Sequence, residues 1–281
     1  MIIAVAGGKG GCGKTTVAVN LALSLEGEVQ ILDCDVEEPN VHLLVKTEQK
    51  WEKPVTVPVP SIDTEKCILC GKCNEFCQYH ALAQISSKVL FFPELCHGCG
   101  GCKLVCPAEA IVEVERRIGV IRGCEAEDGK VKLVYGLLEV GEPRAVPVIE
   151  AVRAEASKNL NPVIVDVPPG TSCPVISTLR GVDYLVLVAE PTPMGLHDFQ
   201  LMVEVARQLN LRFGVVVNKA GLGGKEVYDI CRRENIPILA EIPYSRRIAE
   251  LYSKGVPFVR AMPEWTERFR RLMDRIVEEA S

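Results

Sequence analysis

Eight of the chain's thirteen cysteines form two short runs with the same spacing. Each run reads C-x2-C-x2-C-x3-C, the first at Cys67, Cys70, Cys73 and Cys77 and the second at Cys96, Cys99, Cys102 and Cys106. Thiolates on a tight loop can each bind a different iron of a cubane iron–sulfur cluster, which needs four such ligands. The spacing therefore predicts that this part of the chain binds two 4Fe–4S clusters.

Zinc and disulfides are the alternative uses of these cysteines. Zinc ribbons would show paired C-x2-C knuckles rather than triplets with a trailing fourth cysteine, and disulfides are rare in enzyme-like chains without an export signal. The runs resemble those of two-cluster ferredoxins, in which the fourth cysteine of each run binds the other cluster. The implied sets are Cys67, Cys70, Cys73 and Cys106 for cluster 1, and Cys96, Cys99, Cys102 and Cys77 for cluster 2.

A glycine-rich loop directly follows the first apolar run of the chain. Residues 8–15 fit G-x4-G-K-T, a pattern whose backbone N–H groups cradle nucleotide phosphates at the start of a helix. We expect Lys14 to contact the β- and γ-phosphates of ATP and Thr15 to bind Mg²⁺. The expected ATP-binding residues of the loop are Gly8, Lys9, Gly10, Gly11, Cys12, Gly13, Lys14, Thr15 and Thr16. A chance glycine-rich turn is the alternative.

Composition limits the class of protein. Apolar residues make up 48% of 281 residues, enough for one large domain and a small one. The net charge of −5 provides no basic field for nucleic acid or an anionic membrane. No apolar stretch approaches the roughly 20 residues of a membrane span, and no signal peptide is recognisable. We therefore expect a cytoplasmic protein that binds neither nucleic acid nor membranes.

Short apolar runs alternate with helix-like stretches outside the cysteine segment. The runs are Ile2–Ala6, Val29–Leu32, Val163–Val167, Tyr184–Ala189, Phe213–Val217 and Ile236–Ala240. The helix-like stretches are Thr15–Leu25, Val146–Ser157, Leu196–Leu209 and Lys225–Glu234. Continuous apolar runs are typical of strands buried on both faces of a parallel sheet, and such strands need helical crossovers. The pattern predicts a doubly wound, mostly parallel α/β fold.

The cysteine segment interrupts this rhythm. We expect residues 61–115 to form an inserted, small α+β domain of ferredoxin type, and residues 1–60 and 116–281 to form the P-loop domain. Residues Ile118–Gly141 predict a pair of strands that returns the chain to the sheet, with a turn at Asp128-Gly129. The final helix, Glu264–Glu279, has an acidic polar face, which favours packing on the sheet over membrane binding.

Lys9 makes the assignment of the phosphate loop more specific. The form K-G-G-x-G-K-T-T resembles the deviant Walker A group of P-loop ATPases. That group includes MinD, ParA, the Mrp-type iron–sulfur carriers and the nitrogenase iron protein. The resemblance implies that Lys9 reaches across a homodimer to the partner's nucleotide, so that ATP joins two subunits. A solvated loop lysine is the alternative.

Two aspartates match the same group in the expected order. Asp35 follows the second strand and, by resemblance, positions or activates the attacking water. Together with Lys9 and Lys14 it forms the expected catalytic set. Asp166 ends an apolar run as a Walker B aspartate does, which implies that it holds Mg²⁺ together with Thr15.

Three further residues carry weaker resemblances. Asn218 and Lys219 end a strand where members of the group contact adenine. Cys173 lies seven residues after Asp166, a spacing that resembles a cluster-binding cysteine of the nitrogenase iron protein. Cys173 is therefore a candidate for contact with a metal or a redox partner. A buried, inert thiol is the alternative.

Three functions remain open at this point. The leading hypothesis is an ATP-dependent redox protein, in which ATP binding and hydrolysis control electron transfer from the two clusters to a redox partner. The second is a factor that assembles iron–sulfur clusters or delivers them to an apoprotein. The third is a Min- or Par-like positioning ATPase in which the clusters are only structural.

Overall fold

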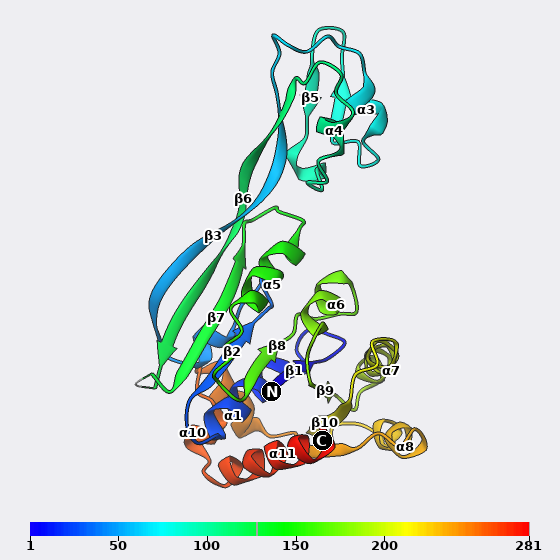
Figure 1. The fold of residues 1–281 in the computed structure, drawn as a ribbon. Coiled ribbons are helices and arrows are strands. Elements are labelled where there is room, and N and C mark those ends of the chain that lie inside the picture. Colours follow the sequence, from blue (N-terminus) through cyan, green and yellow to red (C-terminus); the bar gives the residue numbers. More distant parts are fainter. Residues whose placement is uncertain (128, 281) are drawn as a thin grey trace.

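The fold is described from a computed structural model that covers residues 1–127 and 129–280 (Figure 1). A nine-stranded sheet runs through it, in the spatial order β11-β10-β9-β1-β8-β2-β7-β6-β3. These strands are β11 (Ile238–Pro243), β10 (Phe213–Ala220), β9 (Tyr184–Ala189), β1 (Ile2–Ala6), β8 (Val163–Asp166), β2 (Val29–Asp33), β7 (Val131–Leu138), β6 (Ile111–Ala126) and β3 (Thr47–Ile62). Pairing is parallel from β11 to β7 and antiparallel beyond it. The predicted mostly parallel α/β fold is confirmed.

Alternate residues of the central strands pack against helices on opposite faces of the sheet. In β1, Ile3 and Val5 belong to the core under α1 (Lys14–Ser24) and α11 (Glu264–Ala280). Ala4 and Ala6 belong to the core on the other face. That face is covered by α5 (Ala145–Ala154), α6 (Cys173–Leu179), α7 (Pro193–Gln208) and α8 (Glu226–Arg233). Successive strand residues point to opposite faces, so continuous apolar runs are needed for burial on both sides.

The predicted elements are present, with several boundaries shifted by two or three residues, among them the start of α7 at Pro193 and the end of β10 at Ala220. The strand predicted at Ile236–Ala240 begins two residues later, because the Ile236 N–H still donates to the Cys231 carbonyl at the end of α8 (2.8 Å). The helix predicted at Val146–Ser157 ends at Ala154. The Gln30 amide accounts for this end, because it donates to the Glu155 carbonyl (2.9 Å) and accepts from the Ser157 N–H (2.6 Å).

A long two-stranded arm extends from one edge of the sheet (Figure 1). β3 and β6 have 16 residues each and pair antiparallel from Thr47↔Ala126 to Ile62↔Ile111. The sequence analysis did not assign β3 as a strand, and it placed the start of the β6 segment at Ile118 instead of Ile111. β3 is an edge strand, which explains how it accommodates three prolines. The predicted turn at Asp128-Gly129 includes Asp128, which lies outside the described residues.

Residues 63–110 sit at the far end of the arm (Figure 1). They contain the short elements α3 (Lys72–Phe76), β4 (Leu82–Gln84), β5 (Val89–Phe91), the 3-10 helix η1 (Pro93–Leu95) and α4 (Gly101–Leu104). We call residues 63–110 the cysteine unit. The domain limits at residues 61 and 115 remain a prediction.

The remaining helices lie near the start and the end of the chain. They are α2 (Val41–Leu44), α9 (Arg246–Ser253) and α10 (Phe258–Ala261). α11 buries Trp265, Phe269, Leu272 and Ile276 against the sheet, as expected for a core helix. Across the described part of the chain, no helix combines the length and the apolar character that crossing a membrane requires.

Candidate nucleotide site and cysteine sites

The phosphate loop connects β1 to α1 and needs glycine for close packing. A Cβ atom added at Gly8 would lie 2.4 Å from the Cβ atom of Asp198 in α7. At Gly13, where φ is 98°, an added Cβ atom would lie 2.2 Å from Nδ2 of Asn218. That Nδ2 atom donates to the Cys12 carbonyl (2.7 Å), so β10 holds the loop in place. Side chains at Gly8 or Gly13 would therefore displace the loop.

A cavity of about 380 Å³ opens above this loop. It brings together Gly10, Gly11, Gly13, Lys14, Thr15, Thr16, Asp35, Asn218 and Lys219 from the predicted site. Six further lining residues come from the segment that leads into and through α9, namely Pro243, Tyr244, Ser245, Ile248, Ala249 and Tyr252. The sequence analysis did not find these six, because no motif marks them and only the fold brings them to the loop.

Thr15 and Asp166 meet beside the cavity. The Thr15 hydroxyl donates to Oδ2 of Asp166 at 2.6 Å, while Oδ1 of Asp166 is buried and has no hydrogen-bond partner. Burial, and after it the nearby Asp33 carboxylate, raise the pKa of Asp166 well above its usual range. The Thr15 hydroxyl and the Asp166 carboxylate, which has one oxygen without a partner, fit a hydrated Mg²⁺ ion. The positive charge of that ion would offset the unfavourable burial of the Asp166 carboxylate.

Asp33 anchors the segment that carries Asp35. Its carboxylate is fully buried and accepts from the backbone N–H groups of Asp35 (3.1 Å), Asn40 (3.0 Å) and Val41 (3.1 Å). We call residues 34–41 the switch segment. Asp35 itself faces the cavity, and burial raises its pKa to about 6 against the opposing effect of Lys14. A carboxylate with that pKa is a suitable proton acceptor near neutral pH.

Glu190 holds two lysines beside the loop. Lys9 Nζ lies 3.3 Å from Oε1 of Glu190, and Lys219 Nζ lies 2.7 Å from Oε2. Lys219 also donates to the Gly11 carbonyl (3.2 Å), and Lys14 donates to the Lys9 carbonyl (3.3 Å). Although burial acts in the opposite direction, Lys219 and Lys9 keep the pKa of Glu190 below its usual range. The sequence analysis did not assign Glu190 to the site.

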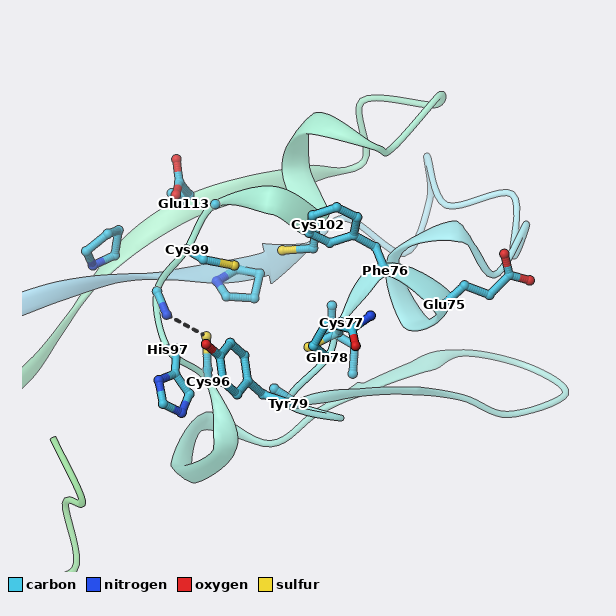
Figure 2. A pocket seen from close by; sticks show the side chains of 16 residues that line it. Glu75, Phe76, Cys77, Gln78, Tyr79, Cys96, His97, Cys99, Cys102 and Glu113 are labelled. Carbon is cyan, nitrogen blue, oxygen red and sulfur yellow. Dashed lines mark hydrogen bonds between the residues drawn. The ribbon is translucent and has the colours of Figure 1, made fainter.

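The eight cysteines of the two runs gather in two groups of four. Cys77, Cys96, Cys99 and Cys102 line a cavity of about 530 Å³ (Figure 2). Cys67, Cys70, Cys73 and Cys106 line a much smaller one of about 20 Å³. Each group thus takes three cysteines from one run and the last cysteine of the other.

One group lies closer to the sheet than the other. Cys96 belongs to the core that contains Val148 of α5, and Cys77 packs against that core. Cys73 and Cys106 belong to a small separate core, which also includes Cys102. We therefore call the group with Cys96 the proximal cysteine site and the group with Cys73 the distal cysteine site. Tyr79 and His97 stack at the proximal site with ring centroids 3.7 Å apart (Figure 2).

Backbone N–H groups point at sulfur atoms in both sites. Gly98 donates to Sγ of Cys96 (3.4 Å; dashed in Figure 2), and Ala110 donates to Sγ of Cys106 (3.3 Å). Gly98 has φ 65°, which only glycine adopts easily in such a tight loop. Such donors stabilise thiolates and are a standard means of tuning iron–sulfur clusters.

The arrangement of the cysteines can also be compared with what a single zinc ion requires. Within residues 1–127 and 129–280, no group of three or more Cys, His, Asp or Glu side chains is arranged to hold a single metal ion. Tetrahedral zinc would need sulfurs about 3.8 Å apart, since each Zn–S bond is about 2.3 Å. A cubane places each sulfur on a different iron, so its four sulfurs need not converge on one atom. Burial raises the pKa of Cys102 to about 11, so cluster binding there must release a proton.

Cys173 lies outside both groups. It is the first residue of α6 and is exposed, so the alternative of a buried, inert thiol is wrong. The other isolated cysteines, Cys12, Cys34, Cys124 and Cys231, are buried. Among the described residues, Cys173 belongs to no group of three or more side chains arranged to hold a metal ion.

Comparison with known proteins points to the same parts of the chain. Residues 3–258 match the family model described as the CobQ/CobB/MinD/ParA nucleotide binding domain. Two uncharacterized proteins of Methanocaldococcus jannaschii are each 32% identical, one over 92% of both chains and one over 99% of this chain and 97% of the relative. An iron-sulfur cluster carrier protein of the same organism is 24% identical over 98% of this chain and 83% of its own.

Solved structures show the same fold. The septum site-determining protein MinD from Pyrococcus horikoshii, complexed with Mg-ADP, matches with a TM-score of 0.60 at 18% identity. The match covers 98% of this chain and 95% of that one. A McdA–ATP complex from Cyanothece matches with a TM-score of 0.59 at 16% identity, over 97% and 95% of the two chains. At these identities the likeness concerns the fold.

Proposed function

Since the chain belongs to the CobQ/CobB/MinD/ParA family of P-loop ATPases, we propose that its ATP cycle controls electron transfer through two 4Fe–4S clusters. One observation carries the proposal. The two cysteine runs exchange their fourth members to form two groups of four, at the end of an arm rooted in the ATPase sheet. A purely structural metal site would not need two such groups in a chain that also carries a nucleotide-driven switch.

The residues of the nucleotide site have separate roles in the proposed hydrolysis. The N–H groups of the loop and the Lys14 ammonium bind the phosphates, and Thr15 and Asp166 are the candidate Mg²⁺ ligands. Mg²⁺, when bound, neutralises phosphate charge and orients the γ-phosphate. Asp35 accepts a proton from water as the water oxygen bonds to the γ-phosphorus, and the bond from that phosphorus to the oxygen of ADP breaks.

Lys9 connects hydrolysis to a homodimer. In the isolated chain its ammonium is held by Glu190 of the same subunit, and 30% of its side chain is exposed. To reach the nucleotide of a second subunit, Lys9 must leave Glu190, which keeps Lys219 as a partner. ATP would supply the competing negative charge, so that dimer formation depends on the γ-phosphate.

The sulfur ligands and the backbone N–H groups of the cysteine unit support the cluster assignment. Each site offers four sulfur ligands and at least one backbone N–H directed at a sulfur. The clusters, when bound, supply one-electron chemistry at low potential. Cys70 and Cys99 are exposed, so each site has one edge at which a redox partner can approach.

Anaerobic purification followed by iron, sulfide and zinc analysis tests the cluster assignment. We expect about eight irons and about eight sulfides per chain, as two 4Fe–4S clusters require. Reduction with dithionite should give two EPR signals from reduced clusters. Stoichiometric zinc, or the absence of acid-labile sulfide, would overturn the proposal.

Cluster delivery is a second candidate function, because related proteins of similar length carry the name iron-sulfur cluster carrier protein. The test is transfer of iron and sulfide to an apo-ferredoxin in the presence of Mg-ATP. Stoichiometric transfer with loss of both clusters from the chain would favour delivery. Retention of the clusters during many ATP turnovers would favour electron transfer.

A further inference from the structure

Arg144 lies between the ATPase sheet and the proximal cysteine site. It is the residue that immediately precedes α5, and its Nη1 donates to the carbonyl oxygen of Cys96 at 2.7 Å. Only 10% of its side chain is exposed. Arg144 therefore makes a nearly buried bond from the ATPase body to the backbone of an expected cluster ligand.

A buried carboxylate fixes the direction of this guanidinium. The side chain of Glu142 is 1% exposed and accepts from Nε of Arg144 (2.5 Å) and from Nη1 of Arg116 on β6 (2.7 Å). Two guanidinium groups share one carboxylate, so the group as a whole carries one net positive charge. Charges that are held in a buried environment act more strongly on their neighbours than exposed ones do.

The other end of α5 packs on the switch segment. Val36, which follows Asp35, is buried, and its carbonyl accepts from the Leu138 N–H at the end of β7 (2.8 Å). A Cβ atom added at Gly136 of β7 would lie 2.6 Å from Val36, 2.8 Å from Val148 and 3.0 Å from Val152. Val36 and two side chains of α5 thus close around Gly136. A shift of the switch segment cannot leave α5 in place, because packed side chains do not compress.

We propose that Arg144 is a positioning residue that transmits the state of the switch segment to the cluster of the proximal cysteine site. The route runs from Asp35 through Val36, along α5 to Arg144, and from there to the Cys96 carbonyl. It rests on the proposed function, because it assumes a cluster at this site. Its physical basis is a continuous set of packed and hydrogen-bonded groups that a bound γ-phosphate would bias.

Within the part of the chain that the structure describes, the distal cysteine site has no comparable contact with a charged side chain. Apart from its cysteines, its cavity is lined by uncharged residues, such as Ile62, Val89 and Ala110. Glu75 and Glu113 line the proximal cavity, but Glu75 is exposed and Glu113 pairs with Lys103 at 3.3 Å. The buried positive charge of the Arg144 group should therefore have the largest electrostatic effect on a cluster in the proximal cysteine site. It should favour the reduced form of that cluster, which carries more negative charge. Nucleotide should change the potential of the proximal cluster alone.

EPR-monitored redox titration of the full chain tests the relay, with and without a non-hydrolysable ATP analogue and Mg²⁺. In the unmodified protein, nucleotide should shift the midpoint potential of one of the two signals. Arg144→Gln should lower that midpoint without nucleotide and abolish the shift. Arg117→Gln is the matched control, since Arg117 is an exposed arginine on the same strand as Arg116 and pairs with Glu139 instead. It should behave as the unmodified protein.

The outcomes separate the relay from the proposed function. A chain without iron and sulfide would refute both. Two normal clusters with no nucleotide-dependent shift, or with the full shift retained in Arg144→Gln, would refute the relay alone. If Arg144→Gln does not fold, Arg144→Lys replaces it: the charge is kept but the forked contact to Glu142 and Cys96 is lost. We then expect a near-normal midpoint with a reduced shift, and a full shift would overturn the relay.

Discussion

The nucleotide site and the cysteine unit are built in different ways. The nucleotide site lies at the ends of strands buried on both faces. Asp33 and Asn218 already hold its backbone, and Glu190 already holds two of its lysines. The cysteine unit has helices and strands of only three to five residues. Two of the four buried residues in its own core, Cys73 and Cys102, are expected ligands. The difference indicates that the ATPase part folds by burial of apolar surface, whereas the cysteine unit would depend on the proposed clusters for its stability.

The largest expected effect comes from Lys14→Ala. Loss of the ammonium should lower the rate of ATP hydrolysis at least about 100-fold, as does removal of one donor from a transition-state site. Iron and sulfide content should not change, because Lys14 is far from the cysteine unit in the fold. Lys132→Ala, which removes an exposed lysine paired with Glu28, is the control. Loss of clusters in Lys14→Ala would contradict the independence of the two parts.

The pH dependence of hydrolysis should report on Asp35. Its pKa of about 6 lies above the usual value for an aspartate, so the basic form is lost as pH falls through about 6. The rate should be level at higher pH and fall about tenfold per pH unit below 6. Asp35→Asn should be slow at every pH and show no such transition. A rate in the unmodified protein that stays level down to pH 4.5 would exclude Asp35 as the proton acceptor.

Glu190→Gln should strengthen ATP-dependent dimer formation. Neutralising Glu190 frees Lys9 from its own subunit, and partly exposed ion pairs of this kind contribute up to about 1 kcal/mol. The dimer dissociation constant with Mg-ATP should therefore fall about fivefold in analytical ultracentrifugation. The control is Glu241→Gln, which removes a carboxylate of β11 that accepts a hydrogen bond from the Tyr228 hydroxyl of α8. An unchanged or higher dissociation constant would show that Glu190 does not hold Lys9 back.

Cys70→Ser tests the comparison in the cysteine unit. Loss of one ligand should lower iron content by about half and remove one EPR signal. Limited proteolysis should then cut within residues 63–110, while ATP hydrolysis stays within about twofold of the unmodified rate. Cys231→Ser, at a buried cysteine of α8, is the control for cysteine loss as such. Full iron content in Cys70→Ser would refute its assignment as a ligand.

Much of the molecule could be predicted from local patterns. The strand Ile2–Ala6, the glycine loop and Lys14 form one continuous segment, so their spacing alone predicts a strand, a phosphate loop and a helix. The triplet in each cysteine group followed from run spacing, since short loops hold three ligands close together, whereas the exchanged fourth cysteine came from the resemblance to two-cluster ferredoxins. β3 was missed because its three prolines are unfavourable in a central strand and only its edge position allows them.

The connections between the parts could not be predicted in this way. Glu190 lies 181 residues from Lys9 in sequence, and Arg144 lies 48 residues from Cys96. Neither contact corresponds to a sequence motif, because residues far apart in the sequence meet only when the chain folds. The sequence therefore indicated what each part binds, while the fold indicated how one part could act on the other.

The most direct measurement is the rate at which the anaerobically reduced protein passes electrons to a one-electron acceptor in a stopped-flow instrument. Mg-ATP is compared with Mg-ADP, in the unmodified chain and in Lys14→Ala. Control of electron transfer by the ATP cycle predicts a rate that differs between the two nucleotides in the unmodified chain and not in the variant. Equal rates with both nucleotides, in protein that holds both clusters, would contradict it.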